Sequence, residues 1–333
     1  MYRLQFSIRR WLGACVLVAG CTAAPGLCAE EGAADPARPQ PAKKMPRADR
    51  VVVLDMDLAG DRVVAVGERG IVLYSDDEGE SWSQADVPIS RTITAVDFLD
   101  ERRGFAVGHD SALLRTDDGG ASWSLQKFAP EDENFFLEVD FPTPERGYIL
   151  GTNGELWISR DGGESWELTV LAVEEWYSNH LFGIAGSTDG TTLIVAEKGV
   201  FYRSPNGLDD WQPLESPYEG SYFGVLSVGD RWLAYGMSGR AYISDDLGDS
   251  WTRVQTGTQQ FLLDGVPVGD GGALLVGRGG VMLYVDLAAG TSITVRREDR
   301  LSVTAVQVLD EWGLLATETG GVTRVPRVEI LAR

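Results

Sequence analysis

The sequence predicts an all-β protein that forms a single seven-bladed β-propeller of four-stranded antiparallel blades. Three observations predict this fold: a phrase that recurs seven times, short strand-like segments within each repeat, and the lack of helical periodicity. The composition is that of a globular chain, since 44% of the residues are hydrophobic and 24% are charged. The formal net charge of −21 argues against a nucleic-acid partner and against docking on anionic lipid, which both require a basic surface.

Residues 1–29 have the pattern of a signal peptide: three arginines, a short apolar run and then small residues. The apolar run is too short to span a bilayer. Two processing routes remain open. Residues 18–21 resemble a lipobox, in which Cys21 would be lipidated, whereas ordinary cleavage would follow a small residue such as Ala23 or Ala29. Either route predicts an exported protein that is periplasmic or anchored to the envelope.

Residues 30–49 are rich in Pro and Ala and contain no aromatic residue, which is typical of a linker or of an unconstrained tail. The three cysteines all precede this segment, at positions 15, 21 and 28. The body of the protein, residues 50–333, therefore has no disulfide and no cysteine metal ligand, and its stability must come from its core.

The recurring phrase is an apolar residue, Gly, two variable residues, Gly, an apolar stretch and then Ser or Thr. Successive copies are spaced 39 to 46 residues apart, and their second positions are Gly67, Gly108, Gly151, Glu197, Gly236, Gly277 and Thr317. Within one unit, four short strands are expected at residues 93–98, 104–107, 112–115 and 123–125. Four strands in a unit of about 40 residues predict a propeller blade.

Five units end in an element that resembles the Asp-box, Ser/Thr-x-Asp-x-Gly-x-Ser/Thr-Trp. The four complete copies contain Ser75, Asp77, Gly79 and Trp82; Thr116, Asp118, Gly120 and Trp123; Ser159, Asp161, Gly163 and Trp166; and Ser244, Asp246, Gly248 and Trp251. A fifth copy, at residues 204–211, is decayed. Polar side chains can accept turn N–H groups, Gly tolerates positive φ, and Trp can pin the hairpin to its blade. We therefore interpret the box as structural and not as a calcium or sugar site.

Two sets of loops should share the face that surrounds the central channel: those leading into the first strand of each blade and those joining its second and third strands. The candidate interface residues on this face are Arg69, Arg91, His109, Asp110, Phe135, Trp176, Tyr177, His180, Lys198, Tyr222, Arg278 and Arg300. Aromatic residues beside mixed charges are typical of a protein interface. A place in the core remains the alternative for Phe135, Trp176 and Tyr177. No catalytic, cofactor-binding or metal-binding residue is predicted, and no cofactor is expected.

From residue 50 to about residue 326, the repeated phrase and the boxes resemble the photosystem II stability and assembly-factor family of chloroplasts and cyanobacteria. This resemblance implies an exported, non-enzymatic scaffold, which we expect to be monomeric, that binds a membrane protein through one face. For a relative in a non-photosynthetic bacterium it implies another envelope partner, such as a transporter. The nearest equivalent of the family's basic patch is the group Arg296, Arg297 and Arg300.

A carbohydrate-active hydrolase of the sialidase type is the alternative, because sialidases share the Asp-box. They also carry an Arg-Ile-Pro segment, which this sequence lacks. Glycoside hydrolysis requires two carboxylates across a cleft, and no spacing among the 50 acidic residues selects such a pair. A sugar-binding module without catalysis is a third reading.

Overall fold

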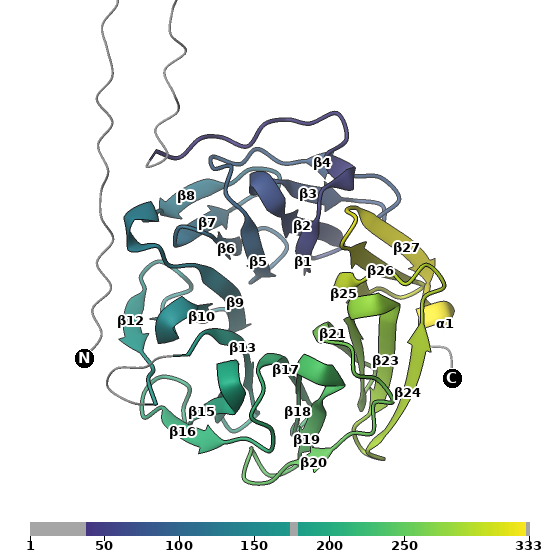
Figure 1. Ribbon diagram of the computed structural model, residues 1–333. Helices are drawn as coiled ribbons and strands as arrows, with labels where there is room; N and C mark the ends of the chain where they lie inside the picture. The colour runs from purple at the N-terminus through teal and green to yellow at the C-terminus, as the bar shows by residue number, and fades with distance from the viewer. Residues whose placement is uncertain (1–37, 174–178, 331–333) are drawn as a thin grey trace, which may run out of the picture. The chain divides into compact units, whose positions relative to one another are not determined.

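The computed structural model describes residues 38–173 and 179–330. Within these residues the chain forms seven antiparallel sheets arranged as a ring around a central channel (Figure 1). The predicted seven-bladed propeller is therefore confirmed. Six blades have four strands, whereas blade 7 has three in the described part of the chain. No helix in these residues has the length and apolar character needed to cross a membrane.

Each blade consists of consecutive strands that pair in chain order from the channel outward. Blade 1 contains β1 (Val53–Ala59), β2 (Arg62–Gly67), β3 (Val72–Ser75) and β4 (Ser83–Gln84). Blade 2 contains β5 (Ile93–Phe98), β6 (Gly104–Gly108), β7 (Ala112–Thr116) and β8 (Ser124–Lys127). Blade 3 contains β9 (Phe136–Thr143), β10 (Arg146–Gly151), β11 (Glu155–Ser159) and β12 (Glu167–Val170). Blade 4 contains β13 (Leu181–Gly186), β14 (Thr192–Ala196), β15 (Val200–Ser204) and β16 (Gln212–Glu215).

The remaining blades follow the same order. Blade 5 contains β17 (Tyr222–Val228), β18 (Arg231–Gly236), β19 (Ala241–Ser244) and β20 (Thr252–Arg253). Blade 6 contains β21 (Leu262–Val268), β22 (Gly272–Gly277), β23 (Val281–Asp286) and β24 (Thr291–Arg296). Blade 7 contains β25 (Val303–Val308), β26 (Trp312–Thr317) and β27 (Val322–Pro326), followed by helix α1 (Arg327–Ile330). The short 3-10 turns are η1 (Ala48–Arg50), η2 (Glu68–Gly70), η3 (Pro130–Asp132), η4 (Thr152–Gly154), η5 (Glu197–Gly199), η6 (Met237–Gly239) and η7 (Arg278–Gly280).

The second strand of each blade is buried along nearly its whole length, because neighbouring blades cover both of its faces. Every residue of β6 is buried, whereas every residue of the outermost strand β12 is exposed. This explains why the second strands are continuous apolar runs and do not alternate. Seven hydrophobic clusters fill the junctions between successive blades, and the last of them joins blade 7 to blade 1.

The two glycines of the recurring phrase are required because other segments of the backbone pass close to them. A Cβ at Gly67 would collide with the carbonyl oxygen of Val52, in the segment that leads into the same blade. Gly70 has a φ of +70°, and a Cβ there would collide with the carbonyl oxygen of Ile89, in the segment that leads into the next blade. The phrase therefore marks the places where successive blades are connected.

The described part of the predicted linker contacts the ring. The backbone N–H of Ala42 donates to the carbonyl of Val87 (3.0 Å), and Ala48 is buried in the cluster between blades 7 and 1. At the start of β27, the N–H of Gly321 donates to the carbonyl of Val51 (2.8 Å). Residues 42–44 therefore lie against blade 1 and its junction with blade 2, whereas residues 45–51 contact the seam, which we define as the junction of blades 7 and 1. The predicted signal segment, including Cys21, lies outside the described residues.

Candidate functional site

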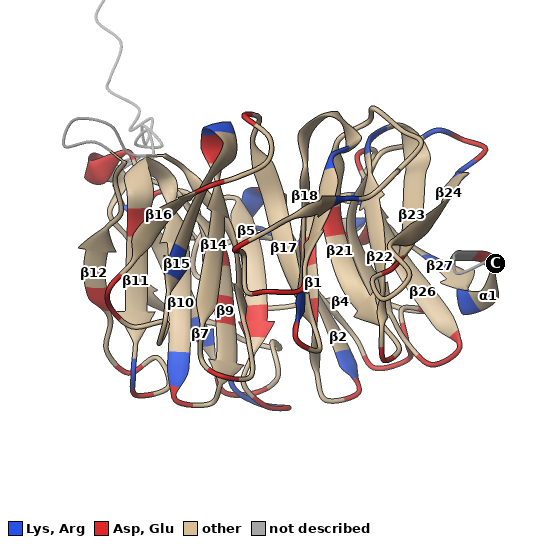
Figure 2. Cartoon of the chain, turned by 90° about the horizontal axis from the view of Figure 1, so that it is seen from below, with Lys and Arg blue, Asp and Glu red and all other residues tan. Residues whose placement is uncertain are grey.

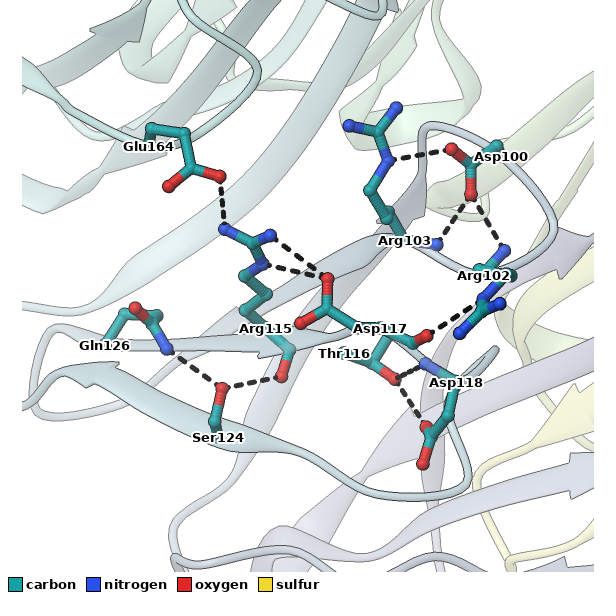
Figure 3. Close-up of polar contacts among 10 residues, drawn as sticks. All are labelled: Asp100, Arg102, Arg103, Arg115, Thr116, Asp117, Asp118, Ser124, Gln126 and Glu164. Carbon is teal, nitrogen blue, oxygen red and sulfur yellow. Dashed lines mark hydrogen bonds and ion pairs between the residues drawn. The ribbon is translucent and has the colours of Figure 1, made fainter.

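The Asp-box hairpins join the third and fourth strands of blades 1 to 5, and each is held by the same local hydrogen bonds. In blade 2, the Thr116 hydroxyl donates to the Asp118 carboxylate (2.8 Å) and accepts the N–H of Gly120 (3.0 Å; Figure 3 shows the carboxylate contact). Asp118 also accepts the N–H and the hydroxyl of Ser122 (2.9 and 2.6 Å). Equivalent bonds join Ser75 to Asp77, Ser159 to Asp161, and Ser244 to Asp246. In the decayed copy, Ser204 bonds to Asn206.

The box tryptophans lie at the junctions between blades, and so contact more than their own blade. Trp123 is 7% exposed, belongs to the cluster between blades 1 and 2, and donates its indole N–H to the carbonyl of Gly120 (3.1 Å). The ring of Trp166 in blade 3 lies 6.0 Å from that of Phe105 in blade 2. Each box therefore packs its own blade against the preceding one.

Sequence reasoning missed a second set of contacts at the end of the ring that carries the Asp-box hairpins, which we call the box rim. An arginine of one blade bonds to the box hairpin of the next blade, and we call these residues the cross-blade arginines. The set comprises Arg62, Arg115, Arg146, Arg203 and Arg324. Arg115, for example, bonds to Asp117 of its own blade and to Glu164 of blade 3 (2.6 Å; Figure 3). Their sequence signal is weak, because the partners lie 44 to 60 residues away along the chain, or 246 at the seam.

The opposite end of the ring is the channel rim, formed by the loops that lead into the inner strands and by those that join second and third strands. Several predicted interface residues meet here between blades 2 and 3. Arg91 forms an ion pair with Asp110, and the ring of His109 stacks on that of Phe135 at 4.5 Å. Burial lowers the pKa of His109, so the imidazole is neutral at pH 7.

The other predicted residues are spread around the channel rim. Nδ1 of His180 accepts the N–H of Asn153 (3.1 Å) between blades 3 and 4, and the guanidinium of Arg278 lies 5.0 Å above the ring of Phe261. Exposed cationic side chains are found at Arg69, Lys198, Arg278 and Arg300. Across residues 38–173 and 179–330, no three His, Cys, Asp or Glu side chains are grouped so that they could hold a metal ion.

Tyr222 does not belong to the interface that the sequence predicts. It is the first residue of β17, its side chain is 0% exposed, and its ring lies 4.6 Å from that of Phe201 in blade 4. The first residue of each inner strand points into the junction between blades, where it forms core. Phe135 is half-buried against His109, and Trp176 and Tyr177 lie outside the described residues.

The channel itself contains acidic side chains that sequence reasoning did not single out. A cavity of about 440 Å³ lies inside the ring, and its lining includes Asp55, Glu138, Asp140 and Asp264. Figure 2 shows acidic residues on the inner strands β1, β9 and β21 as well as on the turns of the box rim. An alignment of the seven first strands could have found them, because these acids occupy the third and fifth positions of their strands.

The fold and its repeated hairpins define a seven-bladed propeller with Asp-box turns. The family model described as photosynthesis system II assembly factor YCF48 matches residues 80–138 and 131–299. Because these matches span more than half of the chain, the protein belongs to this family, which confirms the resemblance. No curated protein sequence is a significant match to the chain.

Three solved structures share the fold. YCF48 from Cyanidioschyzon merolae is 17% identical, with 85% of this chain and 97% of that chain covered and a TM-score of 0.66. YCF48 bound to a D1 peptide is also 17% identical, with 84% and 92% covered and a TM-score of 0.67. The WD40 propeller domain of Doa1 is 12% identical, with 86% and 95% covered and a TM-score of 0.65. At these identities the likeness concerns the fold alone.

Proposed function

We propose that the protein is an exported, non-enzymatic assembly factor that binds a membrane-protein partner through its channel rim. The observation that carries the proposal is membership of the YCF48 family. One solved structure with the same fold is that of YCF48 bound to a D1 peptide. The signal-like pattern of residues 1–29 supports export. The partner of this chain is an envelope membrane protein.

The channel rim supports the proposal through its chemistry. Its exposed side chains are of mixed charge, with the cations Arg69, Arg278 and Arg300 and the acids Glu68 and Glu318. The half-buried ring of Phe261 lies beside Arg278, and that of Phe135 stacks on His109 elsewhere on the rim. Cations next to aromatic rings, on loops held by a rigid ring, are a common basis for protein recognition.

The test is capture of the partner from gently solubilised native membranes by the tagged protein, with bound proteins identified by mass spectrometry. The rim variant combines Arg69→Glu and Arg278→Glu. The matched control combines Arg160→Glu and Arg253→Glu, which make the same charge change on the Asp-box hairpin of blade 3 and on the outermost strand β20. We expect a stoichiometric membrane protein to bind the parent and the control but to be lost from the rim variant. Capture of no membrane protein, or equal capture by both variants, would contradict the proposal.

A further inference from the structure

The seven inner strands carry an uncompensated set of acidic side chains. These strands, β1, β5, β9, β13, β17, β21 and β25, contain no Lys, Arg or His. Their six acidic residues are Asp55, Asp57, Asp97, Glu138, Asp140 and Asp264. All six are half-buried. Negative charge held in a partly buried space without a counter-charge is costly, so each of these residues requires a physical reason.

Four of the six carboxylates have a structural role, because each accepts a backbone N–H from the inner strand of the next blade. Asp55 accepts from Val96 and Asp57 accepts from Phe98, both at 2.8 Å. The same contact, at 2.7 Å, joins Asp97 to Phe141 and Asp264 to Val306. These carboxylates connect blade 1 to 2, blade 2 to 3, and blade 6 to 7.

Glu138 and Asp140 of β9 differ from the other four. Neither has a hydrogen-bond partner among the described residues, although both line the cavity. Burial is the main cause of the raised pKa of Asp140, and repulsion by Asp57 adds to it, so that the value is about 7. Burial also raises the pKa of Glu138. The structure of the ring does not account for these two side chains.

A third polar group without a partner lines the same cavity. Tyr235 of β18 is 4% exposed, and its hydroxyl has no hydrogen-bond partner in the described part of the chain. The hydroxyl reaches the cavity beside Gly224 of the inner strand β17, where a Cβ would collide with it. This hydroxyl borders the cavity, where it is free to accept a hydrogen bond from a molecule bound in the channel.

The wall of the cavity also includes two aromatic rings. Phe182 of β13 and Phe223 of β17 pack edge to face, with their centroids 5.7 Å apart and their planes at 82°. Aromatic faces attract cations, and carboxylates supply the counter-charge. The volume of about 440 Å³ lies within the range of sites for small organic molecules.

We propose that the central channel is a binding site for an organic cation with a primary ammonium or guanidinium group. Glu138 and Asp140 supply the negative charge, and the Tyr235 hydroxyl accepts an N–H of the cation. Phe182 and Phe223 contact the alkyl part of the cation and its charged group. A metal ion fits this site poorly, because no three potential ligands of the described residues converge. The site lies inside the ring and does not depend on the partner proposed for the channel rim.

The test is isothermal titration of the folded protein with cadaverine and with agmatine, which carry ammonium and guanidinium groups. The channel variant combines Glu138→Gln and Asp140→Asn. The matched control combines Glu131→Gln and Asp132→Asn, which remove the same charge from the exposed turn η3. We expect saturable binding to the parent and the control, and a loss of about tenfold or more in the channel variant. Binding should strengthen from about pH 5 to about pH 8 as the carboxylates ionise.

Tyr235→Phe provides a second variant that keeps the packing of the ring, and we expect it to weaken binding by a few-fold. Competition by a blocked lysine or arginine amide would assign the site to a side chain of a partner, whereas binding of the free amines alone would assign it to a diffusible amine. Both results support an organic-cation site. The proposal is overturned if neither amine gives saturable binding to the parent, or if the channel variant and the control bind equally.

Discussion

The box rim and the central channel are both rich in carboxylates, but the protein holds the two groups in opposite ways. At the box rim, hydrogen bonds from Ser81 and Ser75 lower the pKa of Asp77 to about 2, and cross-blade arginines lie beside the hairpins. In the channel, burial raises the pKa of Asp140 to about 7 and that of Asp264 to about 6, and the inner strands offer no cation. Net charge alone therefore says little about how an acidic residue is used.

The difference follows from position in the blade. A box carboxylate lies in a turn, where several N–H groups and hydroxyls converge on it and water reaches it. An inner-strand carboxylate lies on a β-strand, where one N–H of the next blade is the usual donor. In the described part of the chain, the two carboxylates of β9 lack even that donor. The charged form is therefore stabilised at the box rim and destabilised in the channel.

The largest expected effect comes from removing a box tryptophan, which tests whether the box rim is structural. Trp123→Ala would leave a cavity at the junction of blades 1 and 2, so we expect a loss of about 3–5 kcal/mol in the free energy of unfolding. Urea denaturation followed by far-UV circular dichroism measures this loss. A change near zero would show that the ring does not contribute to packing.

A smaller loss is expected when the hairpin loses its central hydroxyl. Thr116→Val keeps the shape of the side chain but leaves the buried N–H of Gly120 without its acceptor, at a cost of about 1–3 kcal/mol. The same denaturation experiment checks it, and Ser124→Ala on the exposed strand β8 provides a control with one hydroxyl fewer. Equal stability of the two variants would contradict a special role for the box hydroxyl.

The pH dependence of stability should separate the two acidic regions. Raised pKa values of Asp140 and Asp264 contribute stability that is present at low pH and lost as the pH rises through about 6 to 7. The lowered pKa of Asp77 contributes stability that is present at neutral pH and lost as the pH falls through about 2. Because water reaches the channel, we expect the fall between about pH 5 and about pH 8 to be about 1–2 kcal/mol.

Denaturation of the parent and of an Asp140→Asn/Asp264→Asn variant at both pH values measures this fall. The lowered pKa of His109 acts in the opposite sense in the same range, so the informative quantity is the difference between variant and parent. We expect the variant to lose less stability than the parent at the higher pH. Identical pH profiles would contradict the assignment of the fall to the channel.

The smallest effect is expected for a cross-blade arginine. Arg115→Gln removes ion pairs to Asp117 and Glu164, whose side chains are more than half exposed, so the loss should be at most about 1 kcal/mol. It should shrink further in high salt, because exposed charges are screened. A loss that is insensitive to salt would mean that the arginine acts through packing.

The sequence predicted the fold well because the repeat is visible in residues whose role is local. The strands expected at residues 93–98, 104–107, 112–115 and 123–125 correspond to β5, β6, β7 and β8, with ends that differ by one or two residues. That blade 7 has three strands in the described residues was not predicted, because the repeat count assigns the same content to every unit.

Side-chain roles that depend on neighbouring blades were harder to predict. Tyr222 was placed on the rim because it follows a loop, but the bulge at the start of each inner strand turns its first residue into the junction between blades. Glu138 and Asp140 were not recognised, because what sets them apart is that neither carboxylate accepts an N–H from the described residues of the next blade, and this depends on two strands together. The cross-blade arginines were missed for the same reason.

The seam has a consequence for how the chain folds. Contacts between successive blades link residues about 40 apart, such as Asp55 and Val96 with a separation of 41, whereas the Thr304 hydroxyl bonds to the Val53 carbonyl across 251 residues. Closing the longer loop costs about 1.6 kcal/mol more in chain entropy. High contact order slows folding, so we expect blades to form successively and the ring to close last. Residues 45–51, which contact the seam, would then complete the last step of folding.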